Sequence, residues 1–224
     1  MQIAVLPLSE QMILTLAALI LFTSFLLLAQ TRIVTLIHTF AWQGVLLFLA
    51  TVLVAFVSGR HHLLISAAMT LGLKVFFIPW QLRRLVIRLD IRRNVETVGN
   101  SSLIMIGAGA LVLFSYYVAL PIRELSLHST RNMIAISLAV ILIGMLMIIT
   151  RRKAVAQVVG FMSMENGLLF AAVVATYGMP MVVELGVAFD VLVAAILFGI
   201  FFFQIRSGIG SLNVDHLNRL NEVD

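Results

Sequence analysis

The sequence contains no cysteine, and this absence removes several classes of site. Without thiol groups the chain forms no disulfide, offers no thiolate to zinc or to an iron–sulfur cluster, and has no cysteine nucleophile. A glycine-rich phosphate loop and the motifs HExxH, GxSxG and CxxC are also missing. We therefore expect no bound cofactor or metal, and no bond-making catalysis by this chain itself.

Charged residues are the second scarcity. They make up 11% of the 224 residues, against about 25% in a typical soluble domain. The formal net charge is +5, but the basic residues stand in short segments between apolar runs, where they act first as topology signals. This composition argues against a soluble globular protein, a disordered chain and a nucleic-acid-binding protein.

Apolar runs make up most of the chain. Hydrophobic residues account for 62% of it, and the mean hydropathy is +1.11. Because one spanning helix takes about 20 residues, the sequence predicts seven spans, near 11–29, 33–57, 63–80, 102–120, 132–150, 154–176 and 181–205. Each must be helical, since a backbone in lipid has to satisfy its own hydrogen bonds. The predicted fold is an all-α, polytopic membrane protein. We expect the first run to be a retained helix, because residues 1–10 carry no basic residue.

The basic residues predict the orientation of the chain in the lipid bilayer. Eleven of them fall on one side of the predicted spans and three on the other, while Lys74 lies within a span. The richer side carries Arg32, Arg83, Arg84, Arg88, Arg92, Arg93, Arg151, Arg152, Lys153, Arg206 and Arg219, and the poorer side carries Arg60, Arg123 and Arg131. Because basic loops are retained in the cytoplasm, we expect the N-terminus outside and the C-terminus in the cytoplasm.

Residues 81–96 have the pattern of an amphipathic helix at the cytoplasmic interface. Leu82, Leu85, Val86 and Leu89 recur at helical spacing with arginines between them. Such a helix anchors the chain on anionic lipid or offers a docking surface to a soluble partner. The tail 207–224 is polar and too short for a domain.

A weak internal repeat divides the chain. A shift of 123 residues overlays Gln43-Gly44 on Asn166-Gly167, and residues 80–83 on 203–206. This overlay indicates a possible parallel repeat of the first three and the last three helices. The predicted units are 1–101, with three helices and the amphipathic segment, a linker helix within 102–131, and a second three-helix unit with its tail in 132–224.

Glu165 is the clearest candidate for a functional residue. It is the twelfth residue of the run 154–176 and therefore lies near the middle of the bilayer, where a charged side chain costs about 2.5–3.5 kcal/mol. On the helical wheel it lies opposite a stripe of small residues, which lets another helix approach closely. The stripe consists of Ala156, Gly160, Ser163 and Gly167. Glu165 is then either a proton carrier or a permanently protonated acid that is hydrogen-bonded between helices.

Four further ionisable groups fall within or close to predicted spans. Lys74 either extends to the membrane surface or pairs with a buried carboxylate. Asp190 is the tenth residue of the last run, whereas Glu184 stands near the outer end of that run. His38 stands near the cytoplasmic end of the second run, and histidine is a residue type that suits proton exchange.

Together these groups predict a conduit for protons. Glu165 would be the central carrier, Asp190 its partner acid and Lys74 a modulating base, with protons passing through water or through the amides of Asn166 and Gln43. Two alternatives remain open: a structural subunit with neutral buried acids, and a free-standing transporter of a small ion. Pro79 and Pro180 stand at span ends, whereas transporters tend to have helices broken at mid-membrane.

The segment 151–167 resembles the small three-helix membrane subunit of respiratory complex I (NuoK type, MrpC type in cation antiporters). Arg151-Arg152, Gly160, Glu165 and Asn166 match that family's pattern in order, and residues 211–215 resemble its cytoplasmic tail. Aligned on Gly160 and Asn166, however, Met162 stands where the family has its glutamate. The likeness covers roughly 132–216.

The whole chain is similar to the hydrogenase-4 component E family (HyfE type), membrane subunits of group 4 nickel–iron hydrogenase and formate hydrogenlyase complexes. The resemblance implies a non-catalytic subunit of a proton-translocating redox complex in a bacterial or archaeal cytoplasmic membrane. Its partners would be antiporter-like and NuoH-like membrane subunits and the lipid bilayer. The implied proton-pathway residues are Glu165, Asp190, Lys74, Asn166, Glu184 and His38.

Overall fold

A computed structural model describes residues 7–59, 62–88, 100–121, 128–176, 186, 188–193, 195, 196 and 199. Within them the chain forms helices and no strand. The helices are α1 (Leu8–Ala29), α2 (Ile33–Ser58), α3 (His62–Thr70), the π-helix η1 (Leu71–Phe77), α4 (Ile78–Arg88), α5 (Ser101–Ala119), α6 (His128–Thr150) and α7 (Ala154–Thr176). The described residues from 186 onward are also helical.

The predicted spans agree with the observed helices. Six helices of the described chain are long and apolar enough to cross a membrane, and they coincide with the first six predicted spans to within a few residues at most ends. The seventh predicted span, 181–205, falls largely outside the described residues, although 188–193 within it are helical. The protein is thus an all-α, polytopic membrane protein, as predicted.

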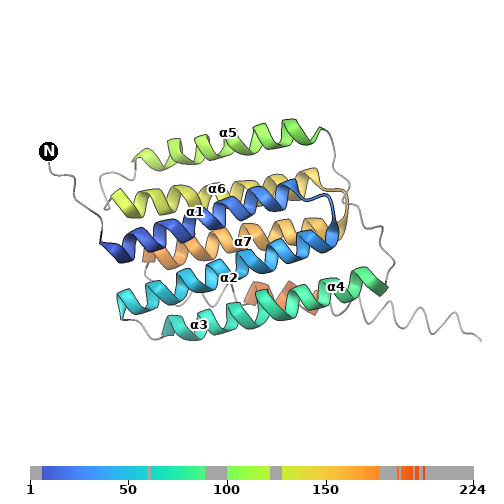
Figure 1. The fold of residues 1–224 in the computed structure, drawn as a ribbon, viewed down its shortest axis with the longest axis horizontal. Helices are drawn as coiled ribbons and strands as arrows, with labels where there is room; N and C mark the ends of the chain where they lie inside the picture. The colour runs from blue at the N-terminus through green and yellow to red at the C-terminus, as the bar shows by residue number, and fades with distance from the viewer. Residues whose placement is uncertain are drawn as a thin grey trace, which may run out of the picture.

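The helices form two layers (Figure 1). α1, α2 and the helix that runs from α3 to α4 make the first layer, while α6, α7 and the helical residues near 190 make the second. α1 packs on α6 and α2 packs on α7, while α5 covers the outer side of α6. The predicted repeat stays a prediction, but two residue pairs that are 123 positions apart are in contact: Gln43 with Asn166, and Leu28 with Arg151.

The third span differs from a regular helix near its middle. α3, η1 and α4 follow one another without a break, and the Ile78 N–H donates to the Leu73 carbonyl, five residues back. Pro79 comes directly after Ile78, has no N–H, and its ring would clash with the carbonyl four residues earlier in an α-helix. A wider π turn relieves that clash. The segment that contains Lys74 is thereby wound differently from the rest of the span.

The described part of the predicted interfacial helix continues this span. α4 runs on from η1 through Arg88, with Leu82, Leu85 and Val86 buried and Arg83 and Arg84 exposed. The guanidinium of Arg84 lies 5.3 Å from the ring centroid of Trp80. No separate helix begins at Gln81, and residues 89–96 lie outside the described residues.

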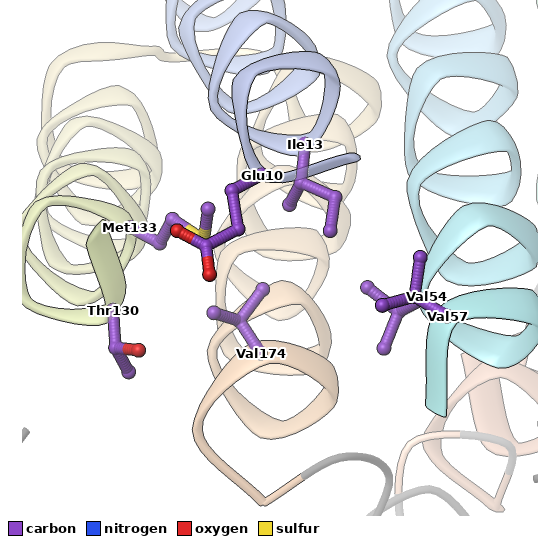
Figure 2. A pocket seen from close by; sticks show the side chains of 7 residues that line it. All are labelled: Glu10, Ile13, Val54, Val57, Thr130, Met133 and Val174. Carbon is purple, nitrogen blue, oxygen red and sulfur yellow. The ribbon is translucent and has the colours of Figure 1, made fainter. Parts of the chain in front are cut away.

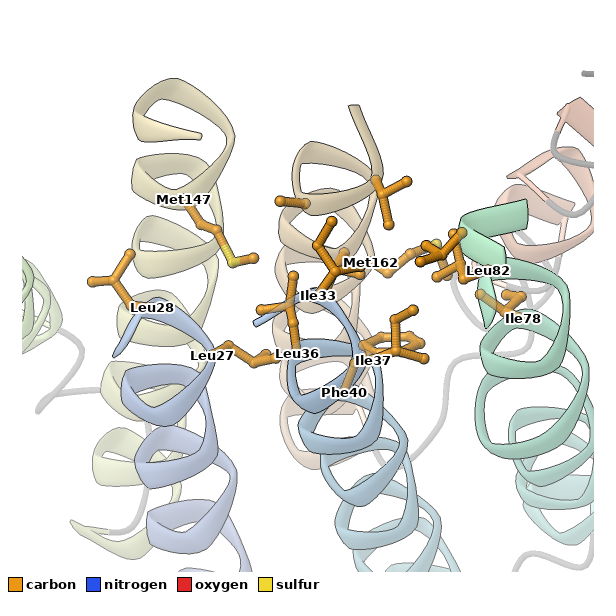
Figure 3. Close-up of a cluster of buried hydrophobic side chains, with 14 of the residues drawn as sticks. Leu27, Leu28, Ile33, Leu36, Ile37, Phe40, Ile78, Leu82, Met147 and Met162 are labelled. Atoms are coloured by element: carbon orange, nitrogen blue, oxygen red, sulfur yellow. The ribbon is translucent and has the colours of Figure 1, made fainter. Parts of the chain in front are cut away.

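Two apolar cores stack along the helices. We call the first the arginine-end core, because the turns with Arg32 and Arg151 lie beside it. Its buried members include Leu27, Leu28, Ile33, Leu36, Ile37, Phe40, Ile78, Leu82, Met147 and Met162 (Figure 3). The far core includes Ile13, Ala17, Ile20, Leu47, Ala50, Phe170 and Val173. Between the two cores lie the buried polar side chains of Ser24, Gln43, Lys74, Glu165 and Asn166, which we call the polar level.

Glycines bring α6 and α7 into backbone contact. A Cβ on Gly144 would lie 2.6 Å from the Met164 nitrogen, and a Cβ on Gly167 would lie 3.0 Å from the Ser137 oxygen. Gly160 approaches the Gly144 oxygen in the same way, at 3.2 Å. Gly160 and Gly167 of the predicted small-residue stripe therefore face α6, as expected. Glu165 is left to face the other side of α7.

Candidate functional site: a buried ionic cluster between the two layers

Lys74 lies at the centre of the polar level between the two cores. It is the fourth residue of η1, and its side chain is fully buried. Gly44 on α2 allows this, because a Cβ at position 44 would lie 3.2 Å from Val75 and 3.5 Å from the Lys74 Cβ. The backbone of η1 therefore sits close to α2, with the Lys74 side chain directed between the layers. The alternative prediction, that Lys74 extends to the membrane surface, is wrong.

Two carboxyl groups face this one ammonium group. The Lys74 Nζ is 3.0 Å from Glu165 Oε2 on α7 and 3.4 Å from Asp190 Oδ1. Both acids are almost fully buried, with 3% of Glu165 and 1% of Asp190 exposed. Apart from this ammonium, no described residue donates a hydrogen bond to either Glu165 oxygen. Both carboxyl groups thus contact the same cation.

The charges of the three groups do not balance when all are ionised. One ammonium and two carboxylates leave one net negative charge in a region without water contact, and such a charge is costly. One additional proton on either acid removes it. The cluster is therefore neutral when one of the two acids that contact this nitrogen atom is protonated.

A chain of hydrogen bonds extends from the cluster toward α1. Lys74 Nζ donates to Asn166 Oδ1 at 2.8 Å, and Asn166 Nδ2 donates to Gln43 Oε1 at 3.1 Å. Gln43 Nε2 donates to Ser24 Oγ at 2.8 Å, and the Ser24 hydroxyl donates to the Ile20 carbonyl at 3.0 Å. All five residues of this hydrogen-bond chain are buried inside the bundle. The polar level thus reaches from the helix with Asp190 to α1.

The two cores close this polar level from both ends of the bundle. On α2, Gln43 stands between arginine-end core residues 33–40 and far core residues 47–55. On α7, Glu165 and Asn166 stand between residues 155–162 and 169–174 of the same two cores. Along the described parts of α2 and α7, an apolar core thus lies on each side of the polar level, whereas the polar level itself runs across the bundle.

The structure brings together four of the six predicted residues. Glu165, Asp190, Lys74 and Asn166 form one contact group. His38 does not join it: its side chain is exposed on α2, and within the described chain no contact links it to the cluster. Glu184 lies outside the described residues. No group of three His, Cys, Asp or Glu side chains suited to a metal ion occurs among the described residues.

Sequence reasoning did not foresee Ser24, nor the π turn at Lys74. Ser24 lies in the apolar run of α1 and looks like an ordinary small helix-packing residue. The signal for the π turn was Pro79, which was assigned to a span end but lies within the helix that runs from α3 through α4. A proline inside a helical run has to disturb the preceding turn.

Arg151 is a second buried charge, at the arginine end of the bundle. Its exposure is 2%, and its guanidinium Nη2 donates to the Leu28 carbonyl in the last turn of α1. Burial lowers the pKa of Arg151. The Arg151 carbonyl accepts a hydrogen bond from Gln157 Nε2 at 2.9 Å. Arg151 therefore binds the turn between α6 and α7 to the end of α1, as a cation suits a helix C-terminus.

At the opposite end of the bundle, a small cavity of about 60 Å³ lies between the two layers. Its lining residues are Glu10, Ile13, Val54, Val57, Thr130, Met133 and Val174 (Figure 2). The Glu10 carboxyl points toward Met133 and Val174 in this view. Far core residues separate the cavity from Gln43 and Asn166.

Comparisons with known proteins show relatives over most of the chain. It is 31% identical over 188 residues to the uncharacterized protein Rv0085 of Mycobacterium tuberculosis, an alignment that covers 83% of this chain and 85% of that protein. It is 26% identical over 162 residues to hydrogenase-4 component E of Escherichia coli (strain K12) and of Shigella flexneri, with 71% of this chain and 74% of those proteins covered. No family model matches the chain, and no solved structure matches it.

Proposed function

We propose that this chain, which belongs to the same family as the mycobacterial protein Rv0085, is a non-catalytic membrane subunit of a hydrogenase-like redox complex. The likeness to hydrogenase-4 component E supports this proposal, because that protein's name places it in a hydrogenase. Antiporter-like and NuoH-like membrane subunits would be its neighbours, and the cytoplasmic membrane its location. The basic turns with Arg32 and Arg151 would face the cytoplasm.

Within such a complex, the buried cluster would transfer protons. The observation that carries this proposal is Lys74 between Glu165 and Asp190, at 3.0 and 3.4 Å, in a polar level that two apolar cores enclose. A structural ion pair needs one acid for one base. A second acid on the same ammonium gives the cluster a proton that can move between two sites, which is what a carrier requires.

The transfer step follows from the charges. With one of the two acids protonated the cluster is neutral, and a change of charge in a neighbouring subunit would favour either loss of that proton or its movement to the other acid. Lys74 contacts both acids and would balance whichever carboxylate is ionised. Its ammonium already stands between the two carboxyls, where a metal cation would sit, and this favours protons over sodium as the transferred ion.

The direct test is Glu165→Gln in the assembled complex, with proton translocation measured in inverted membrane vesicles alongside hydrogenase turnover. We expect translocation to be lost while redox turnover by the other subunits persists. The matched control is Glu10→Gln, which removes a carboxyl outside the cluster. Unchanged translocation in Glu165→Gln would mean that the acids serve only helix packing and that the subunit is structural.

A free-standing ion transporter is a second candidate, and η1 is the observation that favours it. The absence of mid-span helix breaks argued against a transporter from the sequence, but the third span contains a π segment at its middle, and helix interruptions mark transporter sites. Mild solubilisation and affinity purification separate the two candidates. Co-purification with hydrogenase-type membrane subunits supports the subunit, and a chain that purifies alone and moves ions in liposomes supports the transporter.

A further inference from the structure

The hydrogen-bond chain from Lys74 to α1 has a fixed direction. At its far end the acceptor is the Ile20 main-chain carbonyl, so the Ser24 hydroxyl has to donate there and can only accept from Gln43. Gln43 therefore turns its NH₂ group toward Ser24 and its carbonyl toward Asn166. Asn166 in turn directs its NH₂ group toward Gln43 and its carbonyl oxygen toward Lys74. Each amide orientation is set by the previous one.

We propose that Ser24 and Gln43 are positioning residues, which orient the Asn166 carbonyl oxygen toward Lys74 and so hold the ammonium between Glu165 and Asp190. This inference rests on the proposed proton transfer and names the groups that keep its base in place. Neither residue touches a carboxyl of the cluster in the described structure. Their effect passes through Asn166 alone.

Orientation, and not proton conduction, is the role that this geometry supports. An amide has no readily lost or gained proton near neutral pH, and each amide in the chain is held in one orientation by donors and acceptors on both sides. In this proposal Asn166 and Gln43 act as a fixed polar support, and not as the path for protons that the sequence predicts. The mobile proton stays with the two acids.

Burial makes this orientation matter. Ser24, Gln43 and Asn166 are each at most 1% exposed, so water cannot replace a missing partner, and a reversed Asn166 amide would direct its NH₂ group at an ammonium. A donor facing a buried cation is costly. Gly44, next to Gln43, lets the backbone of η1 approach α2, so that the support and the base lie side by side.

The test removes single groups of the hydrogen-bond chain and compares the effect with that of removing the neighbouring hydroxyl group of Thr23. Ser24→Ala deletes the group that fixes Gln43, and Gln43→Leu deletes the middle of the chain. In the assembled complex, we expect the number of protons translocated per turnover to fall about threefold for Ser24→Ala and about tenfold for Gln43→Leu, which is the range expected for loss of a hydrogen bond between neutral groups. The amount of assembled complex is measured for each variant, and translocation is expressed per assembled complex.

Thr23→Val is the matched control. The Thr23 hydroxyl donates to the same Ile20 carbonyl, at 2.8 Å, and Thr23 is also buried, but it does not contact Gln43. We expect its translocation to stay at the wild-type level. The double variant Ser24→Ala/Gln43→Leu should be no worse than Gln43→Leu alone, because both changes interrupt the same chain.

The possible outcomes separate this inference from the proposed function. If Ser24→Ala and Gln43→Leu behave like Thr23→Val while Glu165→Gln abolishes translocation, the positioning role is wrong and the proton-transfer role stands. If the two losses multiply in the double variant, they are independent packing defects, and the positioning role is again wrong. If Glu165→Gln has no effect, the proposed function itself fails.

Discussion

The two layers of the bundle contribute opposite chemistry to one cluster. The first layer supplies the base Lys74 and the neutral groups of Ser24 and Gln43, whereas the second supplies the acids Glu165 and Asp190 with the amide of Asn166. Neither layer balances its buried charge alone, since an unpaired ion in an apolar interior is costly. The difference teaches that the cluster is completed only when the layers pack, so the charge balance of the cluster and the tertiary structure depend on the same contacts.

Removal of the base should break this balance most strongly. Lys74→Met takes away the ammonium that contacts both acids, and loss of one partner from a buried ion pair costs about 3–5 kcal/mol. We expect a lower midpoint of thermal unfolding in detergent, less protein in the membrane and no proton translocation. Adding Glu165→Gln and Asp190→Asn to this variant should restore part of the stability, since no ionisable group of the cluster then remains. A Lys74→Met protein as stable as the wild type would show that the layers do not depend on the pair.

Separation of α7 from α6 should be the next largest effect. A Cβ at Gly144 would collide with the Met164 backbone, one residue from Glu165, and backbone cannot yield as a flexible side chain can. Overpacking of this kind costs about 1–3 kcal/mol. Gly144→Val should therefore lower the unfolding midpoint and weaken translocation. Gly107→Val on α5, where a Cβ meets nothing within 4 Å, is the control. Equal losses in the two variants would contradict the close contact of α6 and α7.

The two acids should differ in how much each contributes to stability and to proton translocation. Asp190 lies 3.4 Å from the Lys74 ammonium, against 3.0 Å for Glu165, and only Glu165 neighbours Asn166 on α7. We expect Asp190→Asn to lower the free energy of unfolding by at most about 3 kcal/mol. It should leave measurable proton translocation, whereas Glu165→Gln leaves none. Parallel vesicle assays of both variants check this order. The reverse order would make Asp190 the main carrier.

His38 should have the smallest effect. Its side chain is exposed on α2, away from the cluster, and exposed substitutions usually change stability by less than about 0.5 kcal/mol. His38→Gln should therefore leave unfolding and translocation unchanged. A clear loss of translocation would extend the proton route to the arginine end of the first layer.

The helices and the buried charges could be predicted from the sequence, because each depends on local features. The length of the apolar runs predicts the first six spans. An acid in the middle of such a span, such as Glu165, is recognisable from the sequence because its insertion into lipid costs free energy. Lys74 remained ambiguous, since one helix alone does not reveal whether a partner lies opposite. Its partners are Glu165 and Asp190, which lie 91 and 116 positions later in the chain.

The support of the cluster could not be predicted, for a physical reason. Ser24 and Gln43 are neutral residues whose burial in a helix costs little free energy. Their role depends on the side chains that neighbouring helices place beside them. Pro79 did carry a local signal, but its effect appears one turn earlier in the chain, at the π turn around Lys74. His38 is the opposite case: it is a titratable residue in a span, but packing leaves its side chain exposed on α2, away from the cluster.

Infrared difference spectroscopy of the assembled complex, titrated across pH, tests most directly whether the buried acids exchange a proton. Protonated carboxyl groups absorb separately from carboxylates, so a group that takes up and releases a proton appears as a band that changes with pH. We expect such a band in the wild type and its loss in Glu165→Gln, with Glu10→Gln unchanged. A carboxyl band that stays constant across pH in the wild type, or one that persists in Glu165→Gln, would contradict a proton carrier at Glu165.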